Sequence, residues 1–379
     1  MLSFWEKQSF LHYDYLIVGS GIVGLSAAAS LIEKDKNARI LVLERGIFPT
    51  GASTKNAGFA CFGSLTEILA DLKIMSSDQV VSLVNERYQG LLSLRKRLGD
   101  TQIGFLQHGG YELISEKELP ALEKIDMVND LLFPLFENNV YELKNERISQ
   151  FGFDKNFTKS LVFNPYEGQI DTGKMMQSLL RYVQSKGVTV LNQCEVMQIE
   201  DIAEQEMVKV WVKNYIDSEN IVFSAPKIIV CTNAFTSKFF PLENITAGRG
   251  QVLVTEPIPN LKIKGTFHFD EGFYYFRNFE NQLIFGGGRN IDFETENTLK
   301  IAITQKIMNN LEEKLRTIIL PNQSFQIAHR WAGIMAFGKE KKPIVKYHSP
   351  NIILAVRMGG MGVAIGTQIG KQVADLACN

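Results

Sequence analysis

The residues with the clearest chemistry lie near the start of the chain, in the run Gly19-Ser20-Gly21-Ile22-Val23-Gly24. This Gly-x-Gly-x-x-Gly pattern follows the apolar run 13–18 and opens the small-residue run 22–33. A buried strand, a tight turn and a helix in this order form a dinucleotide-binding unit. The first glycine allows the turn, the second lets the backbone approach a pyrophosphate, and the third lets helix and strand pack closely. The N–H groups that start the helix would bind that pyrophosphate.

Glu44 supplies the second part of this pattern. It ends an expected strand over 39–44 and follows Gly24 by about 20 residues, the spacing of the ribose-binding acid in such units. A carboxylate there accepts hydrogen bonds from both hydroxyls of an adenosine ribose and repels a 2′-phosphate, which favours FAD or NAD over NADP. A glycine-rich turn without a ligand is the alternative interpretation.

The sequence indicates no second nucleotide site and no metal site. The run 286–288 is three glycines after an expected strand, but residues 289–297 do not read as the start of a helix, so we interpret the glycines as a bulge or a close backbone approach. The absence of a Cys-x-x-Cys pair argues against a disulfide reductase, a disulfide framework and a zinc site. We expect buried free thiols at Cys61, Cys194, Cys231 and Cys378.

The apolar pattern predicts the elements that hold these residues in place. Helices are expected at 65–97, 116–138, 171–185, 299–315 and 364–376, and strands at 110–114, 188–191, 208–213, 227–231 and 352–356, with a β-rich region over 250–290. We therefore predict a fold that is α/β and α+β. A Rossmann-like domain of discontinuous segments comprises residues 1–80, 150–235 and 325–379, and a mixed-sheet substrate domain comprises 81–149 and 236–324.

Composition limits the classes of function. The 379 residues are 45% hydrophobic and 21% charged, with a formal net charge of −1, as in ordinary globular proteins. This balance gives no global electrostatic attraction to nucleic acid or to an acidic membrane. No apolar stretch reaches the length of a membrane span and no secretory signal is evident, so we expect a cytoplasmic protein.

The segment after the second strand, Thr50-Gly51-Ala52-Ser53-Thr54-Lys55-Asn56-Ala57-Gly58, resembles the D-amino-acid oxidase superfamily. Residues 164–191, 227–234, 274–288 and 357–371 are similar to further blocks of that superfamily, in the same order. The superfamily includes glycine oxidases, sarcosine oxidases, γ-glutamylputrescine oxidases and 2-hydroxyglutarate dehydrogenases. The resemblance implies FAD as the cofactor and makes the Rossmann-like domain an FAD-binding domain.

The resemblance also implies which residues bind FAD. The glycine-rich turn before the last helix is expected beside the pyrimidine end of the flavin, where N–H donors stabilise the negative charge of the reduced form. Sarcosine oxidases hold flavin covalently on a cysteine in the region 334–346, which here contains none, so we expect FAD to be non-covalent. Beyond the glycine run and Glu44, the implied FAD contacts are Arg45, Ser53, Thr54, Asn56, Ala57, Gly58, Val196, Thr232, Asn233, Ala234, Gly333, Arg357, Gly359, Gly360, Met361, Gly362 and Val363.

By the same resemblance, the strand that carries Tyr274, Tyr275 and Arg277 faces the flavin. Its period of two places Tyr275 and Arg277 on one face and Tyr274 on the other. An aromatic wall and a cationic side chain are suited to a small substrate. We expect these three residues and Arg357 in the active site, without a dedicated catalytic base. The alternative is that the tyrosines belong to the core of the sheet.

Met335 departs from the family pattern. Glycine oxidases and D-amino-acid oxidases have a carboxylate-binding arginine after the stretch that corresponds to Trp331-Ala332-Gly333-Ile334, and a methionine cannot form that pair. A substrate with a distant carboxylate or none is therefore expected, unless another arginine replaces the missing one. The Tyr-Tyr-Arg block and its following glycines are most similar to the γ-glutamylputrescine oxidases. The possible replacements are Arg249, Arg277, Arg330 and, foremost, Arg357.

These observations predict an FAD-dependent oxidoreductase that oxidises the C–N bond of a small amine or amino acid and passes electrons to O2 or a quinone. One alternative is a 2-hydroxy-acid or polyol dehydrogenase of the same superfamily. Another is a flavin-binding sensor without catalysis. A tRNA-modifying oxidase is disfavoured by the near-neutral charge.

Overall fold

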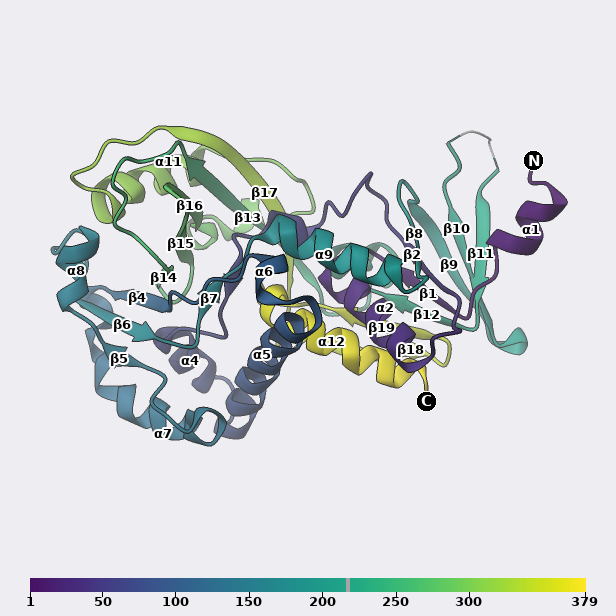
Figure 1. Cartoon of the computed structure of the whole chain (residues 1–379), viewed down its shortest axis with the longest axis horizontal. Coiled ribbons are helices and arrows are strands. Elements are labelled where there is room, and N and C mark those ends of the chain that lie inside the picture. The colour runs from purple at the N-terminus through teal and green to yellow at the C-terminus, as the bar shows by residue number, and fades with distance from the viewer. Residues whose placement is uncertain (216–218) are drawn as a thin grey trace.

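Apolar runs from both ends of the chain meet in one six-stranded sheet of the computed structural model, which describes residues 1–215 and 219–379 (Figure 1). The strand order is β18-β19-β12-β1-β2-β8, and every neighbouring pair is parallel except β18 with β19. The central strands are buried along nearly their whole length, which explains their continuous apolar sequences. The bounds are β1 Tyr15–Val18, β2 Ile40–Leu43, β8 Thr189–Leu191, β12 Lys227–Val230, β18 Ile344–Ser349 and β19 Ile352–Val356.

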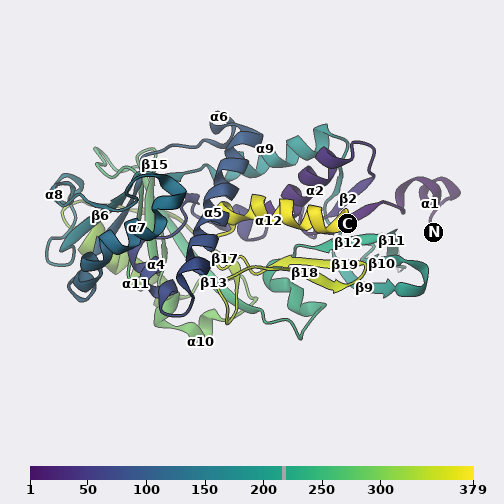
Figure 2. The same ribbon diagram turned by 90° about the horizontal axis from the view of Figure 1, so that it is seen from below.

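Two helices that lie side by side cover one face of this sheet, α2 (Ile22–Lys34) and α12 (Gly362–Ala377) (Figures 1 and 2). Glycines allow their close approach: a Cβ at Gly366 would lie 2.7 Å from the Ile22 side chain, and one at Gly370 would lie 2.5 Å from that of Ser26. The long helix α5 (Ser77–Leu98) crosses α12 through Gly90, where a Cβ would overlap the Ala364 carbonyl. This packing brings the N-terminal ends of α2 and α12 to the same region.

A three-stranded antiparallel sheet covers the other face (Figure 2). Its strands are β9 (Val196–Ile202), β10 (Met207–Val212) and β11 (Ile221–Ala225). Val208 and Val210 of β10 pack against Leu16 and Leu41 of the larger sheet. The six-stranded sheet is therefore the middle layer of three.

An eight-stranded mixed sheet forms the other half of the molecule, in the order β17-β13-β16-β15-β14-β4-β6-β5. Aromatic side chains fill one of its faces, including Phe267, Phe276 and Phe285, and helix α11 (Gln305–Lys314) covers them. Helices α4 (Leu65–Leu72), α5 and α7 (Ile125–Phe136) pack against the other face at β4 and β6. The strands are β4 Gly110–Ile114, β5 Glu142–Leu143, β6 Ser160–Asn164, β13 Thr246–Thr255, β14 Thr266–Phe269, β15 Tyr274–Phe279, β16 Gln282–Gly287 and β17 Ile327–Phe337.

Short elements complete the fold. Helix α9 packs against α2, and the distant segments β3 and β7 form a short antiparallel pair. The remaining bounds are α1 Phe4–Phe10, α3 Ala52–Lys55, α6 Asp100–Ile103, α8 Glu146–Phe151, α9 Thr172–Ser185, α10 Phe293–Glu296, β3 Phe59–Ala60 and β7 Gly168–Gln169.

The predicted fold class is confirmed, but several predicted boundaries were wrong. The helix expected over 65–97 is interrupted, because Ser76 forms a capping box with Gln79 that starts α5. Residues 299–304 are not helical: the Thr304 N–H donates to the Gln251 side chain over 2.8 Å, so this segment bonds to β13 instead. Strands β6 and β17 belong to the eight-stranded sheet, although they lie in the segments 150–235 and 325–379 that were expected to bind the cofactor.

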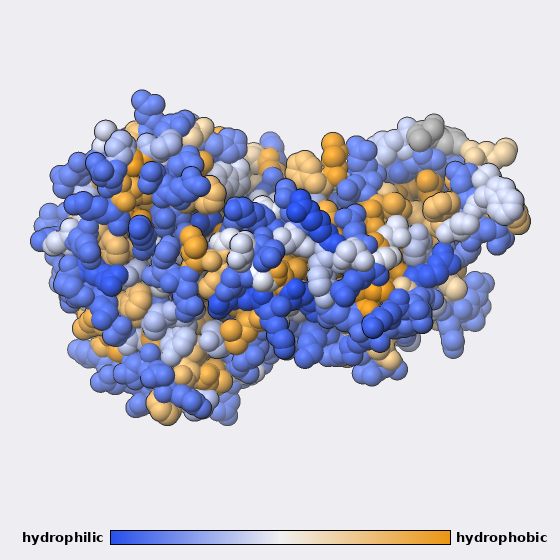
Figure 3. Space-filling model, in the orientation of Figure 1, coloured by the Kyte–Doolittle hydropathy of each residue, from blue (hydrophilic) through white to orange (hydrophobic). Residues whose placement is uncertain are grey.

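The surface in the view of Figure 3 is mostly hydrophilic, and apolar side chains occur there in small separate groups. None of the helices over residues 1–215 and 219–379 combines the length and apolar character needed to cross a bilayer. All four cysteines are free; Cys61 and Cys231 are buried as expected, whereas Cys194 is half-buried and Cys378 is exposed.

Glu112 generates a testable pH dependence of stability. This buried carboxylate of β4 accepts hydrogen bonds from the hydroxyls of Ser64 and Thr66 and from the Thr66 N–H, at the start of α4. Burial raises its pKa to about 7, against 4.5 ordinarily, so the folded protein retains a proton that the unfolded chain releases. Stability is therefore lost as pH rises between these two values, by roughly 3 kcal/mol at most.

We expect Glu112→Gln to remove this loss. The melting temperature of the wild-type protein should fall relative to that of the variant between about pH 5 and about pH 8, measured by calorimetry. The exposed Glu116→Gln is the matched control and should track the wild type. Parallel melting temperatures for Glu112→Gln and wild type would contradict the assigned pKa.

Candidate active site

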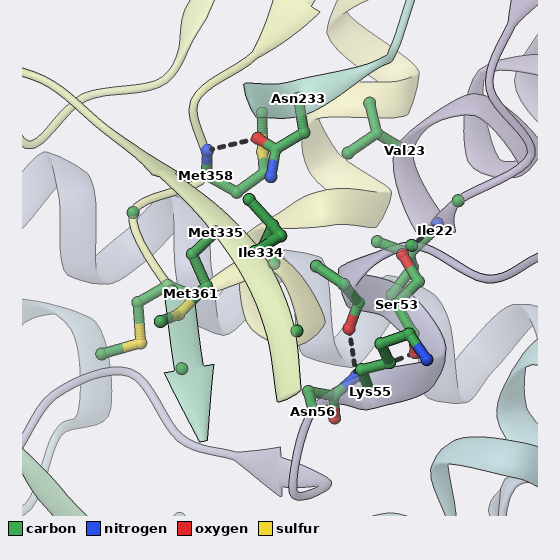
Figure 4. A pocket seen from close by; sticks show the side chains of 18 of the residues that line it. Ile22, Val23, Ser53, Lys55, Asn56, Asn233, Ile334, Met335, Met358 and Met361 are labelled. Carbon is green, nitrogen blue, oxygen red and sulfur yellow. Dashed lines mark hydrogen bonds between the residues drawn. The ribbon is translucent and has the colours of Figure 1, made fainter. Parts of the chain in front are cut away.

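A cavity of about 420 Å³ lies between the two halves, within the size range of small-molecule and cofactor sites. Figure 4 shows side chains from separate segments converging on it: Ile22 and Val23 from α2, Ser53, Lys55 and Asn56 around α3, Ile334 and Met335 from β17, and Met358 and Met361 before α12. The glycine-rich run, Glu44 and the turn before the last helix are thus brought together, although they lie far apart in the sequence.

The glycines of the first turn are required by backbone contacts. Gly19 has φ of 106°, and a Cβ there would lie 2.9 Å from the Cys231 carbonyl oxygen. A Cβ at Gly24 would overlap the Gly19 carbonyl. Gly21 lines the cavity, and a Cβ there would lie 3.0 Å from Ser53 Oγ. The start of α2 is therefore open to a bound pyrophosphate only while these residues lack side chains.

Glu44 lies at one end of the cavity and is only 7% exposed. One carboxylate oxygen accepts from Ser20 Oγ (2.7 Å) and the Ser20 N–H (3.2 Å), and the other accepts from the Gly46 N–H (2.9 Å). These bonds fix the carboxylate beside the glycine turn, with lone pairs left for ribose hydroxyls. Beside it, the exposed Arg45 stacks over the Phe235 ring at 3.8 Å.

The segment around α3 is held by side-chain hydrogen bonds to α2, to α9 and to its own backbone. Ser53 Oγ accepts from the Ile22 N–H at 2.9 Å and so caps α2 from outside that helix. Asn56 Oδ1 accepts from the Gly58 N–H at 2.8 Å and from the Thr172 hydroxyl at 3.0 Å. The small residues of this segment are therefore presented to the cavity in a fixed conformation.

The turn before α12 completes the cofactor end. Gly359 and Gly360 have φ of 58° and 85°, and α12 begins at Gly362. The Asn233 side chain accepts from the backbone N–H of Arg357 at 3.1 Å and of Met358 at 3.5 Å (Figure 4). The N-terminal end of α12 thus faces the cavity, with its positive dipole end and free N–H groups.

Most residues that the sequence assigned to FAD line the cavity. Apart from Arg357, the others contact residues that line it: Ser20 bonds Glu44, Gly24 packs against Gly19, Thr54 bonds the Gly51 carbonyl, Gly58 bonds Asn56, and Ala234 packs against Ile334. The cavity-lining members are Gly19, Gly21, Ile22, Val23, Glu44, Arg45, Ser53, Asn56, Ala57, Val196, Thr232, Asn233, Gly333, Gly359, Gly360, Met361, Gly362 and Val363.

Arg277 does not line the cavity, contrary to expectation. Its buried guanidinium donates to the carbonyls of Ala57, Ile170 (3.1 Å) and Asn278 (3.0 Å). Burial lowers its pKa to about 10. Arg277 therefore holds the Ala57 segment in place instead of binding substrate.

Arg357 is also absent from the cavity wall that the described residues form. Its guanidinium turns away and donates to the carbonyls of Lys342 (2.8 Å) and Asn244 (3.1 Å), close to Glu340 (3.5 Å). The two other predicted candidates are paired as well, Arg249 with Glu296 and Arg330 with Glu312. None of the arginines proposed from the sequence is placed to bind a substrate.

The two tyrosines separate as the period of two predicted. Tyr275 lines the cavity, whereas Tyr274 is 2% exposed within the aromatic core and donates to Asn310 over 2.7 Å. The Tyr275 ring fits against Gly286, where a Cβ would lie 2.6 Å from it. Phe59 packs edge-on against Tyr275, with ring centroids 5.6 Å apart. Tyr275, Phe59, Met335 and Phe337 thus form an apolar substrate end.

Arg289 lines this end of the cavity and was not among the residues predicted from the sequence. It follows the three glycines that were interpreted as a bulge or close approach; Gly287 and Gly288 have φ of 127° and 74° and turn the chain there. Its guanidinium lies 4.1 Å from the centroid of Phe337. Lys55, Lys341 and Phe235 also line the cavity and were not assigned.

A buried cluster of Cys61, Glu167 and His268 lies against the cavity, with ligand-type atoms within 4.8 Å of one another. His268 Nε2 is 3.7 Å from a Glu167 oxygen. Burial raises the pKa of the Cys61 thiol and of the Glu167 carboxyl. Burial lowers the pKa of His268, but Cys61 and Glu167 together outweigh it and leave that pKa above its ordinary value. More than a hundred residues separate the three partners along the chain, so sequence spacing could not reveal them.

The chain is similar in sequence to a known family and in fold to several solved structures. The sequence model of a family described as FAD dependent oxidoreductase matches residues 14–376. The probable oxidoreductase OrdL of Haemophilus influenzae is 23% identical, over 96% of this chain and 82% of its own length. Glycine oxidase from Geobacillus kaustophilus aligns with a TM-score of 0.76 at 19% identity, over 97% of this chain and 95% of its own. L-proline dehydrogenase from P. horikoshii gives 0.74 at 18%, over 97% and 93%.

The first test of the cofactor site is Gly21→Val. The branched side chain would meet Ser53 and block the pyrophosphate path, so we expect FAD loading to fall on the order of tenfold or more. The ratio of flavin to protein absorbance after purification measures it. Gly173→Val, on the exposed first turn of α9, is the matched control. Full loading of Gly21→Val would refute this placement of the pyrophosphate.

A second test is Glu44→Gln, which preserves size but removes the charge. Losing charge-assisted bonds to the ribose should weaken FAD binding by about 1.5–3 kcal/mol. Titration of the apoprotein with FAD, followed by flavin fluorescence, gives the affinity. Glu33→Gln, near the far end of α2, should bind FAD like the wild type. An unchanged affinity in Glu44→Gln would remove this residue from the ribose site.

Proposed function

The chain belongs to the family of FAD-dependent oxidoreductases, and on that premise we propose that it oxidises a C–N bond of a small amine or amino acid by hydride transfer to flavin. The cofactor end of the cavity fits FAD: the glycine turn and the start of α2 suit the pyrophosphate, Glu44 the adenosine ribose, and the N-terminal end of α12 the flavin. Bound FAD supplies the hydride acceptor.

The observation that carries this proposal is the apolar character of the substrate end. Burial disfavours the charged form of an amine, so walls of aromatic and methionine side chains favour the neutral amine. The neutral form is the one whose neighbouring C–H bond can be oxidised. Tyr275 and Phe59 orient the substrate carbon, and Met335 and Phe337 exclude water from it. The chain itself need not remove a proton from carbon.

An alcohol makes a different demand, because its hydroxyl proton must pass to a base. Burial raises the pKa of Tyr275 to about 12, so its phenol retains the proton. His268 is buried beside the cavity, and Cys61 and Glu167 raise its pKa despite the opposing effect of burial, so it releases its proton less readily than an ordinary histidine. These side chains suit the oxidation of a C–N bond better than that of a C–O bond.

The named neighbours give limited further support. Glycine oxidase and L-proline dehydrogenase, by their names, oxidise amino acids, and both have this fold. Their low identity to this chain carries the architecture only. We propose O2 or a quinone as the electron acceptor, since the sequence has no second nucleotide fingerprint.

A panel of substrates tests the reaction class. Under anaerobic conditions, amines and amino acids should bleach the flavin absorbance of the wild-type enzyme, and matched hydroxy acids should bleach it at least about 100-fold more slowly in stopped flow. Glycine against glycolate and alanine against lactate are matched pairs. Faster bleaching by hydroxy acids would establish the dehydrogenase alternative, and no bleaching by either class would favour a sensor.

A further inference from the structure

Arg289 is a half-buried cation that forms no ion pair with the described residues. Among the described residues, no carboxylate lies within ion-pair distance of its guanidinium; Nη2 donates to the Asn297 amide oxygen over 3.1 Å, and Nε is buried without a partner. Glu296, the nearest acid to influence it, is already paired with Arg249 through two bonds of 2.8 Å. Burial lowers the pKa of Arg289, which reports that its charge is poorly solvated.

The position of Arg289 directs this charge into the substrate end. Its side chain lies over β13 at Gly248, where a Cβ would be 2.9 Å from Nε, and is flanked by the rings of Phe337 (4.1 Å) and Phe293 (4.8 Å). Gly250 is two residues after Gly248 on β13 and so belongs to the same face of the strand. It lies beneath the Tyr275 hydroxyl. Residues of alternate positions on a strand are about 7 Å apart, so Arg289 and Tyr275 overlook neighbouring parts of one surface.

The Tyr275 hydroxyl is a second donor there. It has no hydrogen-bond partner within residues 1–215 and 219–379, and it retains its proton at neutral pH. Met335, which stands where the family has an arginine, is paired with Gly248 across the β13–β17 ladder. The Arg289 side chain lies over the same glycine. A guanidinium and a phenol converge on a space lined by glycines.

We propose that Arg289, with the Tyr275 hydroxyl, forms an anion subsite that binds the carboxylate of the substrate. A buried guanidinium binds a carboxylate through charge-assisted, often two-point, hydrogen bonds. The substrate class is then an amine that bears a carboxylate near the reacting carbon, instead of the amine with a distant carboxylate or none that Met335 alone suggested. That the bound anion is part of the substrate rests on the proposed function. That an anion binds between Arg289 and Tyr275 does not.

Binding of an inert anion tests the subsite without turnover. Benzoate and benzamide have the same shape and differ in charge, and each is titrated into the FAD-loaded protein by calorimetry. We expect the wild type to prefer benzoate. Arg289→Met should weaken benzoate binding about 30-fold or more and leave benzamide binding within about twofold. Arg289→Lys, which keeps a point charge, should recover part of the loss.

Controls separate binding from damage. Arg330→Met removes an arginine paired with Glu312 outside the cavity and should bind benzoate like the wild type. Flavin content and melting temperature report whether each variant is folded. Equal binding of benzoate and benzamide by the wild type would overturn the proposal, and so would an equal loss of both ligands in Arg289→Met, which would make Arg289 only a packing wall.

Kinetics distinguish this inference from the reaction class. In Arg289→Met, kcat/KM should fall mainly through KM for amines that carry a carboxylate, and little for uncharged amines such as benzylamine. If no amine reduces the flavin while benzoate binding still depends on Arg289, the subsite stands and the proposed function fails. If amines reduce the flavin equally well in wild type and Arg289→Met, the proposed function stands and the subsite fails.

Discussion

Close helix packing at glycines is the constraint on which the site depends. Helix α12 can lie against α2 only because Gly366 and Gly370 have no side chains, and α5 can cross α12 only at Gly90. Gly24 brings α2 equally close to the first turn. Together these contacts bring the N-terminal ends of α2 and α12 to one cavity. In the FAD placement that we propose, the partial positive charges and free N–H groups of both ends would act on the same cofactor.

The eight-stranded sheet uses small residues for a different purpose. Gly248, Gly250 and Gly286 leave room above the strands, and Tyr275, Met335 and Arg289 occupy that room from neighbouring positions. The substrate end is thus shaped by which strand positions lack side chains. This explains how a cavity lined largely by apolar groups retains a few polar ones at defined places.

The cofactor end was largely predictable from the sequence, because its signals are local. The spacing of Gly19, Gly21 and Gly24 after an apolar run, with Glu44 at the next strand, depends on a single strand–helix–strand unit. The strand period likewise separated Tyr274 from Tyr275. Most helices and strands near the chain ends were predicted for the same reason, since their apolar periods are strong.

The arginines could not be assigned in this way. Whether a guanidinium points into the cavity or bonds to a carbonyl depends on contacts between distant segments, as for Arg277 with Ala57 and Ile170. Arg289 was missed because a left-handed turn at Gly287 and Gly288 redirects the chain after β16, and no strand or helix period extends across such a turn. The helix predicted for residues 299–304 was wrong for a similar reason, because the Gln251 side chain of β13 accepts a hydrogen bond from the backbone of Thr304.

Arg277 also bears on how the molecule moves. It extends from β15 in one half to two carbonyls of the other half, at Ala57 and Ile170, and all three residues are buried or nearly so. A hinge motion between the halves would separate the Arg277 guanidinium from these carbonyl acceptors, at a cost of several kcal/mol. Arg277 therefore couples the two halves on the side of the cavity where the Ala57 segment lies. With this contact intact, exchange of small molecules with solvent would require motion of loops at the rim instead of a hinge between the two sheets.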